Sequence, residues 1–367
     1  MKTITPCVLR TFTDGALASA IAIALFTGCR SLGPGTVGRD RFEYSTAIGD
    51  SWKRQTLLNI VKLRYLDPPI FVDVGQIVSG YSLERGVSVS GQLAKSGAGD
   101  QFAAAGAHAI LTDRPTITYT PLTGNKFVKS LMTPLTPESV FFMIQAGWPA
   151  DNVLLLTLAS INGLKNQEST INGTVPPDKD FLRALALLRR IQLSSSVAFR
   201  VRQDAKGQQT ALLNIYRENI TPEALADSTE LRRLLRLDPD ATEFELVFGA
   251  VAANNQEVAV LTRSILHLMQ TMAAQVEVPP QDLAQHNAAP GWESAPDLDM
   301  ANRLIQIRSS KDAPARAYVA VSYNDYWFWI DKHDLKSKRV FASMMMLFTL
   351  ADSGEKEALP LITIPAQ

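Results

Sequence analysis

The residues that could perform acid–base or nucleophilic chemistry lie near the C-terminus. His333 stands between Asp331 and Asp334, and an imidazole held by a carboxylate can act as a general base. Ser353 and Lys356 have the Ser-x-x-Lys spacing of acyl-serine enzymes. No nucleophile elbow accompanies His333, the partner motifs of Ser353 are missing, and Asp334 equally suits the N-cap of a following helix. We therefore expect no catalysis, and hydrolysis of glycan or peptide around His333 is an alternative.

A second cluster, at 326–329, is aromatic. An Asn-Asp turn between two alternating runs predicts a two-residue hairpin, with Tyr326 and Phe328 on one face and the two tryptophans on the other. Aromatic rings can stack on glycan, so Tyr326, Trp327 and Trp329 form a candidate ligand or partner surface. The apolar run Met-Met-Met-Leu-Phe that follows could cover one face, and core packing is the favoured interpretation.

The composition indicates neither a metal nor a cofactor. The 367 residues include 4 histidines and 2 cysteines, and no pair of them has metal-ligand spacing. Neither a phosphate-binding Lys-Ser/Thr loop nor a His-Glu-x-x-His helix is found. The 36 basic and 36 acidic residues balance, so no single-sign field favours nucleic acid. A hydrophobic content of 46% is sufficient for a substantial core.

The elements that would position these residues alternate between helices and strands. Helices are expected at 44–66, 126–132, 137–146, 180–192, 221–235, 258–272 and 335–351, and strands at 116–120, 197–202, 210–217, 243–248, 304–308, 318–323, 326–330 and 361–364. Thr136 and Thr221 should be N-caps, Gly147 a C-terminal stop, and 153–161 fits a buried helix or a buried strand. The pattern predicts an α+β fold with a mixed or antiparallel sheet and helices packed on one face.

Two regions are expected, an N-terminal α+β region at 43–194 and a C-terminal α+β region at 195–367. The second contains an irregular Pro-rich stretch at 276–300. The first contains a Gly/Ala-rich hairpin at 86–111, with alternation of period two along its first strand. Strands of about ten residues with one apolar and one small polar face are typical of membrane crossings. Several copies could therefore pool these hairpins into a pore, although the Gly and Ala content favours a mobile loop or a weak edge hairpin.

The N-terminus ends its apolar run in Gly28-Cys29. Behind a leader with Lys2 and Arg10, this run resembles the signal peptide and lipobox of bacterial lipoproteins. The resemblance implies a signal at 1–28, cleavage between Gly28 and Cys29, and lipidation of Cys29, which would be the only cysteine of the mature chain. The run is shorter than the roughly 20 residues that span a bilayer. Phe26 replaces the usual Leu, so a cleaved signal without lipid is the alternative.

The residues after Cys29 predict where the protein is held. Arg30, in place of the Asp that often retains lipoproteins in the inner membrane, favours the periplasmic face of the outer membrane. Residues 29–42 include a Gly-rich stretch and are expected to form a flexible tether. The membrane would then be one partner, contacted through palmitate or a similar acyl chain.

Three stretches resemble a group of uncharacterised proteobacterial lipoproteins: LLNIVKLRYLDPPIFVD at 57–73, YTPLTGNKFVKSL at 119–131 and WFWIDKHDLKSKR at 327–339. The resemblance spans most of the mature chain and implies export without a known activity. We expect a lipid-anchored periplasmic protein that acts as a binding or assembly component at the outer membrane, with an envelope protein or a second copy as partner. The alternatives are an oligomeric pore or secretion-associated lipoprotein that uses the hairpin 86–111, and the hydrolase described above.

Overall fold

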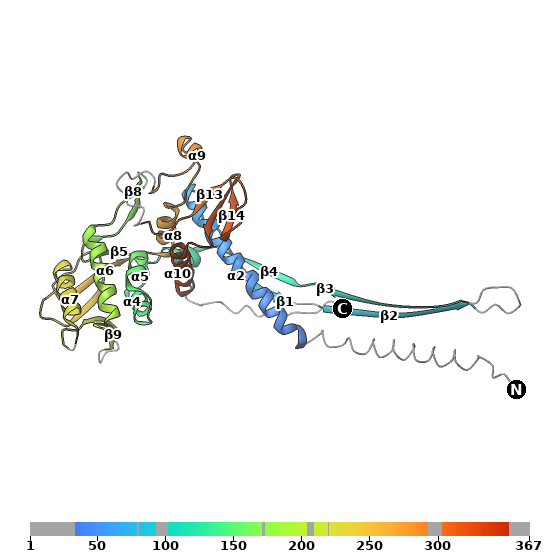
Figure 1. The fold of residues 1–367 in the computed structure, drawn as a ribbon, viewed down its shortest axis with the longest axis horizontal. Helices are drawn as coiled ribbons and strands as arrows, with labels where there is room; N and C mark the ends of the chain where they lie inside the picture. Colours follow the sequence, from blue (N-terminus) through green and yellow to red (C-terminus); the bar gives the residue numbers. More distant parts are fainter. Residues whose placement is uncertain are drawn as a thin grey trace, which may run out of the picture. The chain divides into compact units, whose positions relative to one another are not determined.

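The computed structural model describes residues 34–78, 81–92, 102–170, 173–203, 209–218, 220–292 and 303–351 (Figure 1). The contacts of these described residues form two units, one of residues 34–51 and Val72–Thr120, the other of Trp52–Phe71 and the described residues from Pro121 onward. Helices and mainly antiparallel strands alternate along the chain, and the fold class is α+β, as the sequence predicts.

The helix α2, Pro34–Arg64, begins inside the segment that the sequence predicts as a tether. Residues 34–42 are therefore helical, and residues 29–33 lie outside the described part. Two physical effects explain the difference. Proline at the first helical position is already restricted to a helical φ, and a helix that is nucleated elsewhere gains one hydrogen bond for each residue added, which offsets the cost of Gly35 and Gly38.

The first unit contains a long two-stranded ribbon. The strands β2, Tyr81–Gln92, and β3, Phe102–Asp113, pair antiparallel in continuous register from Tyr81 opposite Asp113 to Gln92 opposite Phe102. The predicted hairpin is confirmed in this pairing and is longer than expected, while its turn lies outside the described residues. The neighbouring strands β1, Phe71–Val78, and β4, Thr116–Leu122, form a separate pair.

The second unit contains most of the helices and strands. Its helices are α3 (Asn125–Met132), α4 (Pro137–Gln145), α5 (Ala150–Thr157), α6 (Lys179–Leu193), α7 (Pro222–Leu234), α8 (Ile265–Ala273), α9 (Pro280–Ala284) and α10 (Leu335–Ala351). Its strands are β5 (Leu158–Ile161), β6 (Leu164–Lys165), β7 (Glu168–Thr170), β8 (Gly173–Val175), β9 (Val197–Gln203), β10 (Gln209–Ile215), β11 (Glu243–Phe248), β12 (Glu257–Thr262), β13 (Arg308–Ser310), β14 (Ala317–Tyr323) and β15 (Tyr326–Asp331).

A six-stranded sheet organises this unit, in the order β6-β5-β12-β11-β10-β9. Only the β11–β12 pair is parallel among its described pairs. Side chains alternate between the two faces of this sheet. Leu213 and Phe244 lie opposite each other and are buried under the helices. Glu243, the residue before Phe244, faces away and pairs with Arg202. The helices α4 and α6 contact β9 on the covered side.

The predicted boundary near Ser195 falls inside this sheet. β5 and β6 precede Ser195, and the other strands follow it. The strands on both sides share one ladder of hydrogen bonds and one buried face. The contacts accordingly place 121–367 in a single unit.

One predicted helix, 258–272, is wrong. It consists of the central strand β12 and the helix α8, separated by Arg263 and Ser264. An apolar run in the middle of a buried sheet has no polar alternation to distinguish it from a helix. The Ser264 side chain accepts a hydrogen bond from His267 N at 3.2 Å, which marks the true start of α8.

Other elements are close to the sequence expectation. The N-caps Thr136 and Thr221 are confirmed, since each accepts a bond from a backbone N–H in the first turn. Gly147 ends its segment with φ +99. The run 153–161 contains the end of a helix followed by a strand. The strand expected at 304–308 is wrong, because β13 begins only at Arg308. The strand expected at 361–364 lies outside the described residues.

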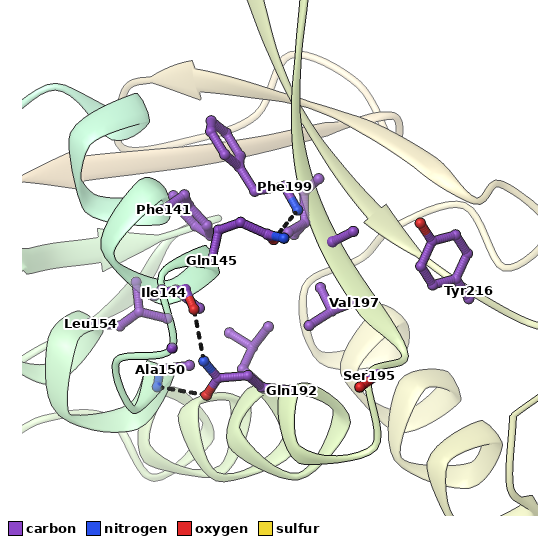
Figure 2. Close-up of a pocket in the computed structure, with 14 residues that line it drawn as sticks. Phe141, Ile144, Gln145, Ala150, Leu154, Gln192, Ser195, Val197, Phe199 and Tyr216 are labelled. Atoms are coloured by element: carbon purple, nitrogen blue, oxygen red, sulfur yellow. Dashed lines mark hydrogen bonds between the residues drawn. The ribbon is translucent and has the colours of Figure 1, made fainter.

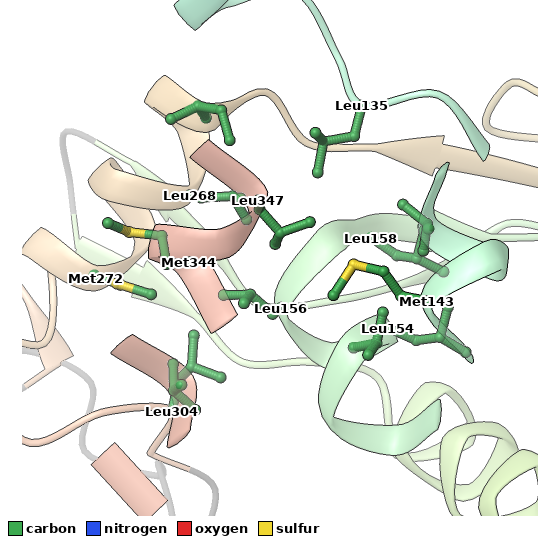
Figure 3. Packing of buried hydrophobic residues seen from close by; sticks show 14 of the residues in the cluster. Leu135, Met143, Leu154, Leu156, Leu158, Leu268, Met272, Leu304, Met344 and Leu347 are labelled. Atoms are coloured by element: carbon green, nitrogen blue, oxygen red, sulfur yellow. The ribbon is translucent and has the colours of Figure 1, made fainter. Parts of the chain in front are cut away.

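The core of this unit is shared by three helices. Leu154 and Leu156 of α5, Leu268 of α8 and Met344 of α10 are almost completely buried and converge in Figure 3. Phe348 of α10 also contacts Trp52, with ring centroids 5.2 Å apart. Burial of these side chains on α10 is what fixes the C-terminal helix, since each such side chain contributes roughly 1.5–3 kcal/mol.

Candidate functional site

A cavity of about 430 Å³ lies between the helices α4, α5 and α6 and the strands β9 and β10 (Figure 2). The lining combines apolar side chains with two amides, a serine and a tyrosine. The lining residues are Phe141, Ile144, Gln145, Gly147, Ala150, Leu154, Leu188, Gln192, Ser195, Val197, Ala198, Phe199, Leu213 and Tyr216. This volume is in the range of small-molecule and side-chain pockets.

The Gln192 amide joins the ends of three helices beside the cavity. Its Nε2 donates to Ile144 O at 3.0 Å and to Trp148 O at 2.7 Å, and its Oε1 accepts from Ala150 N at 3.0 Å (Figure 2). The Arg189 guanidinium donates to the same Oε1 at 2.7 Å. Because every polar atom of this amide has a partner, its role is to hold α4, α5 and α6 together.

The Gln145 amide contacts the edge of the sheet. Its Oε1 accepts a hydrogen bond from Phe199 N of β9 at 3.0 Å. The Phe141 and Phe199 rings stack beside it, with centroids 6.2 Å apart. The lining contains no Asp, Glu, His, Lys or Arg side chain. Its chemistry suits binding of a neutral group that is partly apolar.

The structure places the aromatic candidates on two faces of the β14–β15 hairpin. Asn324 and Asp325 have φ of 47° and 63°, as the predicted two-residue turn requires. Tyr326 accepts a bond from Gln281 Nε2 at 2.9 Å. Alternation along β15 puts Trp327 and Trp329 on the other face, where the Arg308 guanidinium lies 5.3 Å from the centroid of the Trp329 ring. Phe328, between them, is buried, which confirms core packing for that residue. Tyr326, Trp327 and Trp329 are therefore not brought together on one surface.

Two tyrosines anchor this hairpin to the end of α2. Tyr65 OH donates to Asp282 Oδ2 at 2.7 Å, and Tyr323 OH donates to Asp67. The two rings meet edge to face at 5.3 Å. Burial and the hydrogen bond to Asp282 raise the pKa of Tyr65, and burial together with Asp67 raises the pKa of Tyr323 to about 12. Both phenols are therefore neutral hydrogen-bond donors at physiological pH.

The acidic neighbours of His333 have structural roles. Asp331 Oδ1 accepts from the backbone N–H of His333 at 2.8 Å, and Asp334 Oδ1 accepts from Ser337 N at 3.0 Å as the N-cap of α10. Neither of these bonds involves the imidazole, and the His333 side chain is exposed. Ser353 and Lys356 lie outside the described residues, as do Gly28 and Cys29.

Sequence reasoning missed four buried arginines among the described residues, Arg64, Arg232, Arg263 and Arg303. Arg263 donates to Leu156 O at 3.1 Å at the C-terminal end of α5, and also to Gln167 O. Burial lowers its pKa to about 10. Arginine alone in a loop carries no sequence signal for burial, because the carbonyl groups that hold it come from distant segments.

No group of three or more His, Cys, Asp or Glu side chains in the described part of the chain could hold a metal ion. No helix within the described ranges is long and apolar enough to cross a membrane.

Comparison with known proteins adds no relative. No protein-family model matches the chain, and no curated protein and no solved structure is significantly similar to it. The resemblance of the three sequence stretches to proteobacterial lipoproteins thus stays a prediction.

Proposed function

We propose that this chain is a lipid-anchored envelope protein that acts as an assembly component at the outer membrane, and that the β2–β3 ribbon is the element through which it assembles. The observation that carries the proposal is the ribbon itself. Each of its strands has 12 residues, and within the described part of the chain each pairs only with the other. Isolated two-stranded ribbons are marginally stable in water. A long ribbon therefore gains stability when other strands pair with it.

The two faces of the ribbon differ in composition. Alternate positions of β2 from Leu83 to Val89 share one face, and their register partners in β3 are Leu111 and alanines. The opposite face carries Ser82, Glu84 and Ser88 on β2, with His108 and Ile110 among their neighbours on β3, and the described side chains there are exposed. The first face is mainly apolar, with Arg85 as its charged residue, and a mainly apolar face of this kind suits a protein interface or a lipid contact.

The anchoring part of the proposal is supported by the lipobox-like end at Cys29. A lipid on that sulfur would hold many copies in one plane and raise their effective concentration, so weak ribbon contacts would suffice. The proposal assigns no catalytic activity to the chain. Its partner is a second copy or another envelope protein.

Charge on one face of the ribbon provides the test. We expect Val87→Asp together with Val89→Asp to abolish the assembly seen by light scattering of detergent-purified full-length protein, because the apolar face then carries two carboxylates. Ser88→Asp with Ser90→Asp adds the same charge to the same strand on the other face and should leave the molar mass unchanged. A wild-type protein that is strictly monomeric and without a crosslinked neighbour in intact cells would contradict the proposal.

A pore is the second candidate, and the length of the strands favours it. Strands of 12 residues exceed the roughly 9–11 residues that cross a bilayer. Arg85 shares the apolar face with Val87, so the uncharged part of that face is shorter than the strand. Release of a trapped dye from liposomes by the purified oligomer, lost in the Val87→Asp and Val89→Asp variant, would support the pore. Assembly without dye release would leave only the first candidate.

A further inference from the structure

The outer strand of the six-stranded sheet, β9, has an edge that is partly closed by a side chain. β9 is last in the order β6-β5-β12-β11-β10-β9, and no described strand pairs with its outer edge. Phe199 N donates to Gln145 Oε1 at 3.0 Å, so this N–H points away from β10. Because N–H groups alternate in direction along an antiparallel strand, those of Val197 and Val201 point the same way. The amide of Gln145 thus occupies the position that the peptide group of a further strand would take.

The cavity opens beside this edge. Val197, Ala198 and Phe199 are part of its lining, and the Phe141 ring stacks on Phe199. Its volume of about 430 Å³ can accept a large apolar side chain. When a peptide adds to a sheet edge, main-chain hydrogen bonds provide affinity and pockets for alternate side chains provide specificity. The outer edge of β9 offers main-chain hydrogen bonds, and the adjacent cavity offers a pocket for a side chain.

The charges on β9 indicate which kind of strand could pair with its outer edge. Arg200 and Arg202 lie on the face of β9 opposite Phe199, and Arg202 pairs with Glu243 at 2.5 Å. Arg200 donates to Tyr216 OH at 3.2 Å, and its charge also acts on Glu243, the partner of Arg202. Two arginines thus face one carboxylate here, and positive charge is in excess. A second β9 strand would bring like charges together across the new pair, which is unfavourable. A strand with acidic residues at these positions would be attracted.

We propose that β9 binds an extended peptide of a partner protein in which apolar and acidic residues alternate. The peptide displaces the Gln145 amide and pairs with the outer edge of β9. One apolar side chain enters the cavity beside Phe199, and the next, acidic side chain pairs with Arg200. This site is independent of the β2–β3 ribbon and would give the protein a second interaction surface.

The test uses the full-length protein and a short labelled peptide in which valine and glutamate alternate, with a valine–lysine peptide as its control. We expect fluorescence anisotropy to detect binding of the first peptide only. Arg200→Glu should reverse this preference. Val201→Pro removes an outward N–H without touching the β10 ladder and should weaken binding about tenfold. Gln145→Ala should strengthen binding, because the peptide no longer competes with the amide.

Two outcomes would overturn the proposal. One is the absence of binding by both peptides to wild-type and Gln145→Ala protein. The other is a dimer in light scattering that Val201→Pro dissolves, which would make a second copy the occupant. A circular-dichroism melting curve for each variant shows whether the variant is folded. If Val201→Pro does not fold, the change of peptide preference in Arg200→Glu still tests the proposal.

Discussion

Buried cationic side chains hold the second unit together through backbone carbonyl groups. Arg232 donates to Ile215 O at 2.9 Å, and Arg303 donates to Ile305 O at 3.1 Å, while Arg263 joins α5 to the segment around Gln167. Each guanidinium satisfies carbonyl oxygens at the ends of helices or strands that would otherwise be buried without partners. Loops thereby become fixed parts of the core.

Gly291 is the most tightly enclosed of the described glycines. A Cβ atom added there would collide with Arg64 Nη1 and with the backbone oxygen of Ala274. Trp292 N also donates to Ala274 O at 2.8 Å, and this bond holds the two backbone segments close together. We expect Gly291→Ala to lower the free energy of unfolding by about 2–3 kcal/mol in urea denaturation. Gly249→Ala, where the nearest atom would be 3.9 Å away, is the control and should be nearly neutral.

The Tyr323 phenol gives stability a pH dependence. Its pKa rises from 10.0 to about 12 in the folded protein, chiefly through burial and then through Asp67. The neutral phenol is thus favoured by folding. Its contribution is complete below pH 10 and is lost as the pH rises through about 12.

Denaturant unfolding on both sides of this window measures the effect. The free energy of unfolding of the wild type should fall as the pH rises from 10 to above about 12. Because Tyr323 is partly exposed, we expect Tyr323→Phe to make this fall smaller by about 1 kcal/mol. Tyr119→Phe serves as the control, since that side chain is 63% exposed. Equal alkaline losses in the wild type and in both variants would contradict the assignment.

Elements with a clear period and clear ends could be predicted from the sequence, and those inside the core could not. α10 was expected at 335–351 and is found there, because Asp334 caps it and its apolar residues recur at helical spacing. The 258–272 run was misassigned because a central strand is apolar on both faces. The cavity and the roles of Gln145 and Gln192 depend on contacts between distant segments, which spacing along the chain does not report.

The helix α10 offers a matched test of packing. Met344 is completely buried, whereas Met346, two residues further along, is 51% exposed. Met344→Ala should destabilise the protein by about 2–5 kcal/mol, because it leaves a cavity among α5, α8 and α10. Met346→Ala should change stability by less than about 0.5 kcal/mol. Thermal or urea unfolding that gives equal losses for the two would show that α10 does not pack as described.

At the scale of the whole molecule, we propose an acyl anchor at Cys29 together with an assembling β2–β3 ribbon. The second unit has its own hydrophobic core and its own sheet. The first unit contributes the β2–β3 ribbon, whose alternation the sequence reveals but whose partner it does not. Self-association needs more than one chain, and anchoring needs a membrane. Both proposals are therefore tested on protein taken from membranes.

Native mass spectrometry of protein released from membranes in mild detergent tests this account most directly, because a single spectrum reports both modification and copy number. We predict a chain that begins at Cys29, is heavier than its sequence by the mass of acyl chains, and occurs as a defined complex with further copies or with a second envelope protein. A monomer with an unmodified thiol at Cys29, or with its leader still attached, would contradict the account.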